Sequence, residues 1–388
     1  MIKIEGTPAP KVVTVTPKKS GELAGILSAI KKEKGDKVVM AGSDIHPVER
    51  IATGMFEVDI AIGGGFPRGR YSIIYGPEGS TKTNVCYCAI ATAQRMPPPC
   101  NKAVFVDLEG TFSPDWAARF GVNIDELVLV KPAFGEEAVD LIDALVRADD
   151  VAILVVDSLA VVVASKEIAQ STEKFDVGTT SILIKRLCNK MVIALSIESR
   201  RNHTPAVIFI NQTRFKIGVM FGDPETMPGG QTMKFLSSLT VRVYGKNLMD
   251  KLVSTTLPAF KTVHAVVKKA KVPITKIEFD YDMCVYPHDT LKVGQTRSWG
   301  LVSNNLKQIG KLENTGKGWK LEGTVYPTLV VIQDKYENDK DFCNQLQKIV
   351  LDSHKGNMFY CKDPDELKGE EALAKGVIDL ETGEIVGK

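Results

Sequence analysis

The chain reads Ser72-Ile73-Ile74-Tyr75-Gly76-Pro77-Glu78-Gly79-Ser80-Thr81-Lys82-Thr83, an apolar run followed by a glycine-containing loop that ends in Lys-Thr. A helical stretch follows from Asn84. Strand, loop and helix in this order form the context that a phosphate-binding P-loop requires. Backbone N–H groups of the loop would surround a β-phosphate, Lys82 would reach the β- and γ-phosphates, and the Thr83 hydroxyl would ligate Mg²⁺. The sequence therefore predicts that residues 76–83 bind ATP together with Mg²⁺.

Position 81 departs from the usual P-loop pattern G-x-x-x-x-G-K-S/T, because a threonine stands where a glycine normally precedes the lysine. The Cβ atom of Thr81 limits left-handed backbone conformations and the close approach of a ligand. The alternative interpretation is a simple turn that carries a surface lysine. The strand before the loop and the helix after it favour the P-loop.

Short apolar runs rich in β-branched residues alternate with helical patterns between residues 45 and 282. The runs are Tyr71–Tyr75, Ala103–Asp107, Leu127–Val130, Val151–Val156 and Ala206–Ile210. Strands of this kind are buried on both faces, so the pattern predicts an α/β fold with a mostly parallel central sheet covered by helices. Three later runs have no long helices between them and predict antiparallel additions at one edge: Ser238–Tyr244, Lys261–Lys268 and Lys276–Tyr281.

Two of the predicted strands end in acidic residues. Val151–Val156 leads directly into Asp157, the place where a P-loop ATPase keeps the carboxylate that holds Mg²⁺ through water. The alternative is that Asp157 caps the next helix. A second strand ends in Asp107 and Glu109, and one of these carboxylates would polarise the attacking water. Spacing alone does not decide which of the two acids polarises the water.

Composition places the chain among ordinary globular proteins. Its 388 residues are 44% hydrophobic and 25% charged, which argues against a largely disordered or fibrous chain. The 49 basic and 47 acidic residues give a net charge of +2, so a nucleic-acid-binding surface would have to be local. Residues 1–19 lack a signal pattern and no apolar run reaches the ~20 residues of a membrane span. Seven scattered cysteines without a Cys-x-x-Cys pair predict reduced thiols in a cytosol-like compartment and no zinc site.

We expect four parts along the chain. An N-terminal arm, residues 1–44, contains a short amphipathic helix over Leu23–Ile30. The α/β core follows over residues 45–285. Residues 286–362 have a more polar texture and predict a smaller α+β domain. Residues 363–388 hold eight acids and three lysines and predict an acidic tail.

Several of these segments resemble the RecA recombinases. They are Ile51-Ala52-Thr53-Gly54, Asp59–Gly65, Gly69-Arg70, Tyr75–Glu78 and Val155–Ser158. The most specific match is Phe209–Thr226 followed by Gly229-Gly230, a string typical of bacterial-type RecA rather than of P-loop ATPases in general. The resemblance covers about residues 22–281 and extends faintly into the second domain. It implies a RecA-type ATPase core, and the divergent phosphate loop suggests a phage-encoded member.

The resemblance implies roles for residues outside the phosphate loop. Glu109 matches the catalytic glutamate of the family in the same strand-end context, which favours it over Asp107. Gln212 matches the glutamine that senses the γ-phosphate and couples it to the DNA loop that follows. Trp116 stands where the family stacks a tyrosine on adenine, and an indole can stack in the same way.

The resemblance also implies lysines that reach the γ-phosphate of a neighbouring protomer. The segment Val266–Pro273 resembles the part of the family that carries them, with one residue fewer before the proline. Lys268 is the first match, and the second is Lys271 or Lys269. Cations supplied at an interface would make hydrolysis depend on assembly.

A long segment, Thr213–Gln231, is rich in glycine and lacks helical periodicity. In the family the matching loop contacts single-stranded DNA. In this chain, charges and backbone N–H groups of the segment would meet phosphates, and its aromatic and Met side chains would stack on bases. The predicted DNA-binding residues are Arg214, Lys216, Met220, Phe221, Gly229, Gly230 and Gln231.

The sequence thus predicts an ATP-dependent recombinase that assembles head-to-tail on single-stranded DNA and exchanges strands with double-stranded DNA. Recombination mediators are candidate partners, and the cytoplasm of a bacterial or phage-infected cell is the expected location. One alternative is a hexameric DNA helicase with the same core, against which the Met220–Gly230 string argues. Another is a structural filament on single-stranded DNA with weak ATPase, which only Thr81 favours.

Overall fold

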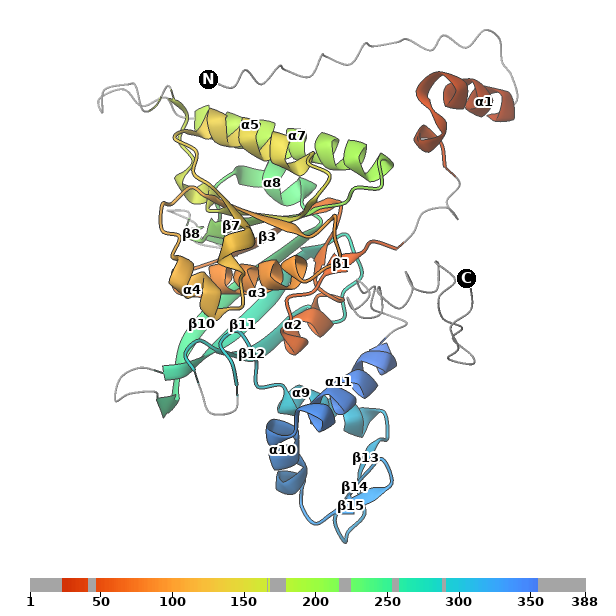
Figure 1. Ribbon diagram of the computed structural model, residues 1–388, viewed down its shortest axis with the longest axis vertical. Helices are drawn as coiled ribbons and strands as arrows, with labels where there is room; N and C mark the ends of the chain where they lie inside the picture. The colour runs from red at the N-terminus through yellow and green to blue at the C-terminus, as the bar shows by residue number, and fades with distance from the viewer. Residues whose placement is uncertain are drawn as a thin grey trace. The chain divides into compact units, whose positions relative to one another are not determined.

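The computed structural model describes residues 23–40, 47–165, 167, 179–215, 225–252, 258–287 and 291–354. By compactness the chain divides into two units, Met1–Pro47 and Val48–Lys388. The larger unit holds the central sheet, its covering helices and a C-terminal group of helices and short strands (Figure 1). The finer domain boundaries expected from the sequence stay predictions.

In the first unit, helix α1 (Leu23–Lys34) precedes the short 3₁₀ helix η1 (Asp36–Val38). Gly35 between them has φ +90°, a left-handed conformation that glycine adopts without penalty and that ends the helix. Leu23 is 70% exposed and Ile26 is 38% exposed. The predicted helix is therefore present, and part of its apolar stripe is open to solvent.

An eight-stranded sheet forms the centre of the second unit, in the order β12-β11-β10-β3-β7-β6-β4-β5. The strands are β3 (Arg70–Gly76), β4 (Lys102–Asp107), β5 (Leu127–Val130), β6 (Val151–Asp157), β7 (Ala206–Gln212), β10 (Leu239–Leu252), β11 (Pro258–Ala270) and β12 (Glu278–Cys284). The pairs from β10 through β3, β7, β6 and β4 to β5 are all parallel. The predicted α/β fold with a mostly parallel sheet is confirmed.

Helices cover both faces of this sheet (Figure 1). The helices packed on the sheet are α2 (Phe56–Ala61), α3 (Lys82–Gln94), α4 (Pro114–Arg119), α5 (Gly135–Val146), α7 (Thr179–Arg200) and α8 (Gly230–Leu236). The C-terminal group contains α9 (Trp299–Gln308), α10 (Leu329–Asn338) and α11 (Lys340–His354). Within the described ranges, none of the helices is both long and apolar enough to cross a membrane.

The alternation of side chains along each strand divides the core into two layers. Ile74 on β3 and Val155 on β6 are buried in the cluster that includes α3. Their chain neighbours Ile73 and Val156 are buried in the cluster that includes α5 and α7. Strands buried on both faces explain why these segments are apolar without interruption.

Two expectations about the sheet are wrong in detail. Leu127–Val130 is the outer strand of the sheet, and Val128 and Leu129 are 42% and 38% exposed, so this strand is not buried on both faces. The run Ser238–Tyr244 belongs to β10, which pairs parallel to β3. Only β11 and β12 are added antiparallel at that edge. An apolar run by itself does not indicate which strand it pairs with or whether the pairing is parallel or antiparallel.

The C-terminal part is an α+β group with its own core. Helices α9, α10 and α11 pack with a three-stranded antiparallel sheet made of β13 (Leu312–Asn314), β14 (Trp319–Leu321) and β15 (Thr324–Tyr326). Trp299 is buried and Trp319 packs against this cluster. Four short strands complete the structure: β1 (Arg50–Ile51) with β2 (Phe66–Pro67), and β8 (Arg214–Phe215) with β9 (Glu225–Thr226).

Candidate functional site

The candidate site lies at the carboxyl edge of the parallel strands, where ligands of such sheets bind. Gly76 at the end of β3 is in register with Gln212 at the end of β7. Asp107 at the end of β4 is in register with Asp157 at the end of β6. The parallel register therefore brings the phosphate loop and the predicted acidic residues to one place.

The phosphate loop runs from β3 into α3, which begins at Lys82. Thr81 directly before it has φ +70°, so this threonine adopts the left-handed conformation that its Cβ disfavours, at a cost of about 1–2 kcal/mol. Lys82 is 9% exposed, and its Nζ donates to the carbonyl oxygen of Pro77 at 2.7 Å. Burial lowers the pKa of Lys82 from its usual value, while the carboxylates of Asp157 and Glu109 oppose that shift.

The residues predicted to hold Mg²⁺ are adjacent. Thr83 Oγ1 donates to Asp157 Oδ2 at 2.7 Å. Burial raises the pKa of Asp157 to about 6, and the hydrogen bond from Thr83 partly offsets this. A hydroxyl and a carboxylate are the hard oxygen donors that Mg²⁺ prefers, so the donor set fits this ion.

The structure distinguishes the two acids at the end of β4, Asp107 within the strand and Glu109 just beyond it. Asp107 is 3% exposed, and its carboxylate accepts hydrogen bonds from the backbone N–H groups of Gly110, Thr111 and Phe112. It therefore holds the turn that follows the strand. Lys131 Nζ also lies 3.6 Å from Asp107 Oδ2. The carboxylate of Glu109 accepts hydrogen bonds from the side chains of Gln212 and Ser158. These contacts support the preference for Glu109 as the catalytic residue.

Glu109 Oε1 accepts hydrogen bonds from residues at the ends of two other strands, β7 and β6. Gln212 Nε2 donates to it at 3.0 Å, and Ser158 Oγ donates to it at 2.5 Å. Gln212 follows Asn211 on β7 and precedes the segment predicted to contact DNA. The same carboxylate is thus linked to β6 and to the strand that leads into the predicted DNA loop.

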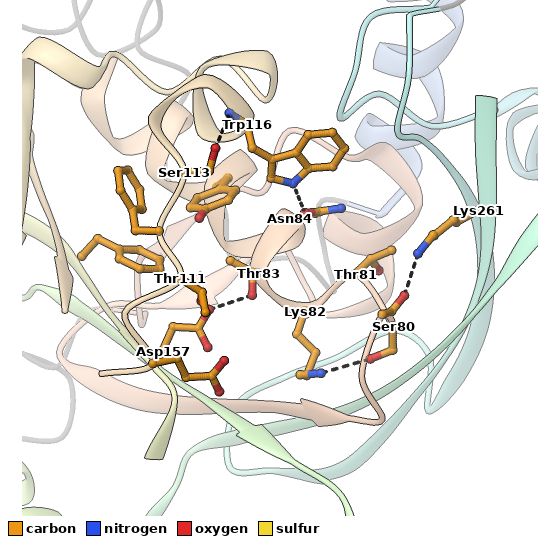
Figure 2. A pocket seen from close by; sticks show the side chains of 15 residues that line it. Ser80, Thr81, Lys82, Thr83, Asn84, Thr111, Ser113, Trp116, Asp157 and Lys261 are labelled. Carbon is orange, nitrogen blue, oxygen red and sulfur yellow. Dashed lines mark hydrogen bonds between the residues drawn. The ribbon is translucent and has the colours of Figure 1, made fainter. Parts of the chain in front are cut away.

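A cavity of about 330 Å³ opens beside these residues (Figure 2). The phosphate loop lines one part of it and Trp116 on α4 lines another. Trp116 Nε1 donates to Asn84 Oδ1 at 3.1 Å, which fixes the orientation of the indole ring. The cavity is lined by Gly79, Ser80, Thr81, Lys82, Thr83, Asn84, Tyr87, Phe105, Glu109, Thr111, Phe112, Ser113, Trp116, Asp157 and Lys261.

The lysines expected to act on a neighbouring protomer lie at the end of β11 and just beyond it. Lys268 and Lys271 are exposed. Lys271 Nζ donates to the carbonyl oxygen of Phe235 at 2.8 Å. Lys269 Nζ donates to the same carbonyl and to that of Lys234. Lys269 and Lys271 therefore cap the last carbonyl groups of α8, where cations are favourable.

The predicted DNA-binding residues fall partly outside the described residues, because Lys216, Met220 and Phe221 lie in residues 216–224. Arg214 on β8 is exposed. Gly229 has φ +90° and precedes α8, whose first residues are Gly230 and Gln231. The expectation that helical structure is lacking up to Gln231 is therefore wrong: the glycine pair starts a helix.

The far end of this segment is tied to the core. Glu225 on β9 and Arg242 on β10 form a two-point contact, with Nε to Oε1 at 2.8 Å and Nη2 to Oε2 at 2.6 Å. Asn211 Nδ2 donates to the carbonyl oxygen of Pro228 at 2.9 Å. Because β10 and β7 flank the phosphate-loop strand β3, the segment is anchored on both sides of the phosphate loop.

The model of the RecA N-terminal domain matches residues 21–286 of this chain. The chain belongs to the RecA family. It is 36% identical over 312 residues to Protein RecA of Azospirillum lipoferum (strain 4B), which covers 79% of this chain and 81% of the relative. It is 33% identical over 350 residues to Protein RecA of Oceanobacillus iheyensis, covering 89% and 94%. A crystal structure of the RadB recombinase covers 61% of this chain and 96% of its own, with 22% identity and a TM-score of 0.45.

RecA-family proteins are DNA-dependent ATPases that bind ATP with Mg²⁺ and form filaments on DNA. This chain is accordingly a RecA-like recombinase, whose activity is ATP-dependent DNA strand exchange. The structure gathers Lys82, Thr83, Asp157, Glu109 and Gln212 at one edge of the RecA core.

Sequence reasoning missed three side chains of this RecA site. Asn84 follows Thr83 directly, and its position after the Lys-Thr pair was the available signal. Ser158 follows Asp157 in the same way. Lys261 comes from β11, and its Nζ donates to the carbonyl oxygen of Gly79 at 2.9 Å. No local pattern could have indicated Lys261, since the two residues are far apart in the sequence.

Proposed function

We propose that this RecA-like recombinase hydrolyses ATP at the cavity beside Gly76–Thr83, with Glu109 as the catalytic residue and Gln212 as the sensor that links the reaction to DNA. The hydrogen bond between Gln212 Nε2 and Glu109 Oε1 is the observation that carries this proposal. It joins the strand end facing the phosphate loop to the strand that leads into the predicted DNA segment. A displacement of Gln212 would therefore displace Glu109, and a displacement of Glu109 would displace Gln212.

The roles of the other residues follow from their chemistry. Mg²⁺ held by Thr83, and through water by Asp157, would neutralise charge on the β- and γ-phosphates. Lys82 adds a positive charge, and the loop N–H groups bind phosphate oxygens. Glu109 accepts a proton from the attacking water as hydrolysis begins. Trp116 stacks on the adenine ring while Asn84 holds the indole in plane.

On the DNA side, we propose that Arg214 and Lys216 meet phosphates and that Met220 and Phe221 contact bases. Gly229, Gly230 and Gln231 would offer backbone N–H groups and one amide at the start of α8. Most of the affinity would come from phosphates, so binding should weaken steeply as the salt concentration rises.

Assembly would complete the site. Lys268 and Lys271, or Lys269 in place of Lys271, would reach the γ-phosphate bound by the next protomer. Because the carbonyl groups of α8 hold Lys269 and Lys271 within one chain, contact with a neighbour's ATP would release the end of that helix. The exposed apolar residues of α1 would dock on the neighbour, a head-to-tail contact that does not close into a ring.

A strand-exchange assay tests the proposal, using homologous and heterologous DNA with and without ATP. The parental protein should exchange only homologous strands and only with ATP. Lys82→Ala should lose ATP turnover at least 100-fold and lose exchange with it. Turnover at the parental rate in Lys82→Ala would contradict the site, and unwinding of a forked duplex without pairing would favour a helicase.

Three finer expectations extend this proposal. The expectation of a phage origin rests on position 81, where threonine replaces the usual glycine. Some phage recombinases also lack that glycine. The cytoplasm of a bacterial or phage-infected cell is the location that we expect. Recombination mediators would act by loading the filament on single-stranded DNA. Pull-down of host replication and repair proteins by the filament would test the last of these.

A further inference from the structure

The phosphate loop holds one residue in a conformation that its side chain opposes. Thr81 has φ +70°, in the left-handed region where a β-branched residue is a genuine outlier. Such a residue persists only where the surrounding structure enforces it. Gly79, two residues earlier, has the same φ of +70° without this penalty. Contacts from outside the loop must therefore stabilise the backbone conformation of Thr81.

Lys261 on β11 supplies such a contact. Its Nζ donates to the carbonyl oxygen of Gly79 at 2.9 Å, and its side chain lines the same cavity as Lys82 (Figure 2). Partial burial lowers the pKa of Lys261 from its usual value. The bond fixes the peptide group that precedes Ser80.

The strand between Lys261 and the loop is built to allow this contact. β10 lies between β11 and β3, and its Gly245 pairs with Val263, two residues from Lys261 on the same face. A Cβ atom on Gly245 would stand 3.2 Å from the Cα atom of Ser80. The backbone of β10 thus packs directly against the loop, and no side chain at position 245 separates Lys261 from Gly79.

We propose that Lys261 is a positioning residue that clamps the phosphate loop in the conformation that Thr81 must adopt, and so strengthens the binding of ATP. The inference rests on the proposed function of the loop. When a binding-competent conformation is only partly populated, the apparent affinity falls by that fraction. With threonine at 81 the competent loop needs the clamp. With glycine at 81 it does not, since glycine adopts positive φ freely.

Equilibrium binding of ATP and steady-state hydrolysis test this dependence. Lys261→Met keeps the apolar stem and removes the ammonium group. It should raise the Kd and the KM for ATP about tenfold, while kcat stays within twofold. In a Thr81→Gly background the same substitution should change the Kd less than twofold. Lys261→Arg retains a donor and should recover most of the affinity.

Lys246→Met is the matched control, because Lys246 is an exposed lysine on the neighbouring strand β10. It should leave the Kd unchanged. Equal losses from Lys261→Met with threonine and with glycine at 81 would show direct contact with the nucleotide and overturn the clamp. No loss with threonine at 81 would overturn it too. Lys261→Gln replaces the Met variant if thermal melting shows that the latter does not fold.

The two proposals fail in different ways. If the loop does not bind ATP, Lys82→Ala retains full turnover. If only the clamp is wrong, Lys82→Ala is inactive while Lys261→Met binds ATP as the parental protein does.

Discussion

Gln212 Nε2 lies 3.0 Å from Glu109 Oε1, although Gln212 ends β7 and Glu109 follows β4, and β6 separates these two strands in the sheet. The bond spans the end of β6, where Ser158 donates to the same oxygen. A glutamine that leads into the predicted DNA segment thus donates a hydrogen bond to the proposed catalytic acid. This relationship couples the two halves of the proposed site.

Removal of the Gln212 amide should uncouple hydrolysis from DNA. In Gln212→Ala, Glu109 loses a partner that reports on the DNA segment, so we expect the stimulation of ATP turnover by single-stranded DNA to fall to near one. The measurement is the turnover rate with and without single-stranded DNA at saturating ATP. Gln308→Ala, on the exposed end of α9, is the control. Parental stimulation in Gln212→Ala would rule out the sensor role.

The two acids after β4 should give opposite phenotypes. Glu109→Gln should lower turnover about 10²- to 10⁴-fold, the range typical of general base catalysis, and leave the melting temperature and ATP binding unchanged. Asp107→Asn weakens bonds to three backbone N–H groups and should cost about 1.5–3 kcal/mol of stability. Thermal melting and turnover, measured on both variants, distinguish the roles. A stable but inactive Asp107→Asn beside an active Glu109→Gln would reverse the assignment.

The apolar residues of α1 should control assembly. Leu23 is 70% exposed in the single chain, and burying a leucine contributes about 1.5–3 kcal/mol. Leu23→Asp should therefore weaken filament assembly at least tenfold without changing the melting temperature of the core. Sedimentation on single-stranded DNA with a non-hydrolysable nucleotide measures the effect. Ser28→Asp adds the same charge at an exposed polar position of α1 and should assemble normally. Equal defects in both would point to charge rather than apolar docking.

A buried glutamate should make stability depend on pH. Glu57 on α2 is 6% exposed, and burial raises its pKa from 4.5 to about 7, against the hydrogen bond from Thr296. Asp282 and Asp59 nearby raise the pKa further. Between these two values the folded protein keeps a proton that the unfolded chain has lost, so the free energy of unfolding falls as pH rises.

Glu57 should account for a defined part of this pH dependence. The free energy of unfolding should be fully retained below pH 4.5, and Glu57 should account for a loss of about 3 kcal/mol by pH 8. Glu57→Gln mimics the neutral acid and should remove this part of the slope. Asp59 and Asp157, whose pKa values burial raises to about 7 and about 6, contribute the remainder. Urea unfolding at a series of pH values provides the measurement. A slope as steep in Glu57→Gln as in the parental protein would assign the titration to another group.

The sequence alone predicted the phosphate loop, the strands that end in acids and the α/β class. These features are local: the strand, the loop and the start of the helix occupy consecutive residues, and uninterrupted apolar runs indicate strands buried on both faces. The mostly parallel order also placed the ends of β4, β6 and β7 at one edge before any contact was known. The resemblance to RecA then gave Glu109, Gln212 and Trp116 their expected roles.

The resemblance favoured Glu109 over Asp107, but only the tertiary structure gave the physical difference, because it shows which carboxylate the backbone N–H groups of the following turn bind. Only the folded sheet placed β5 at the edge, set β10 parallel to β3 and brought Lys261 to Gly79. Each of these depends on packing between residues far apart in the chain, and side-chain periodicity reports only on near neighbours. The sequence marked Thr81 as unusual, and the fold supplied the contacts that let it adopt its conformation.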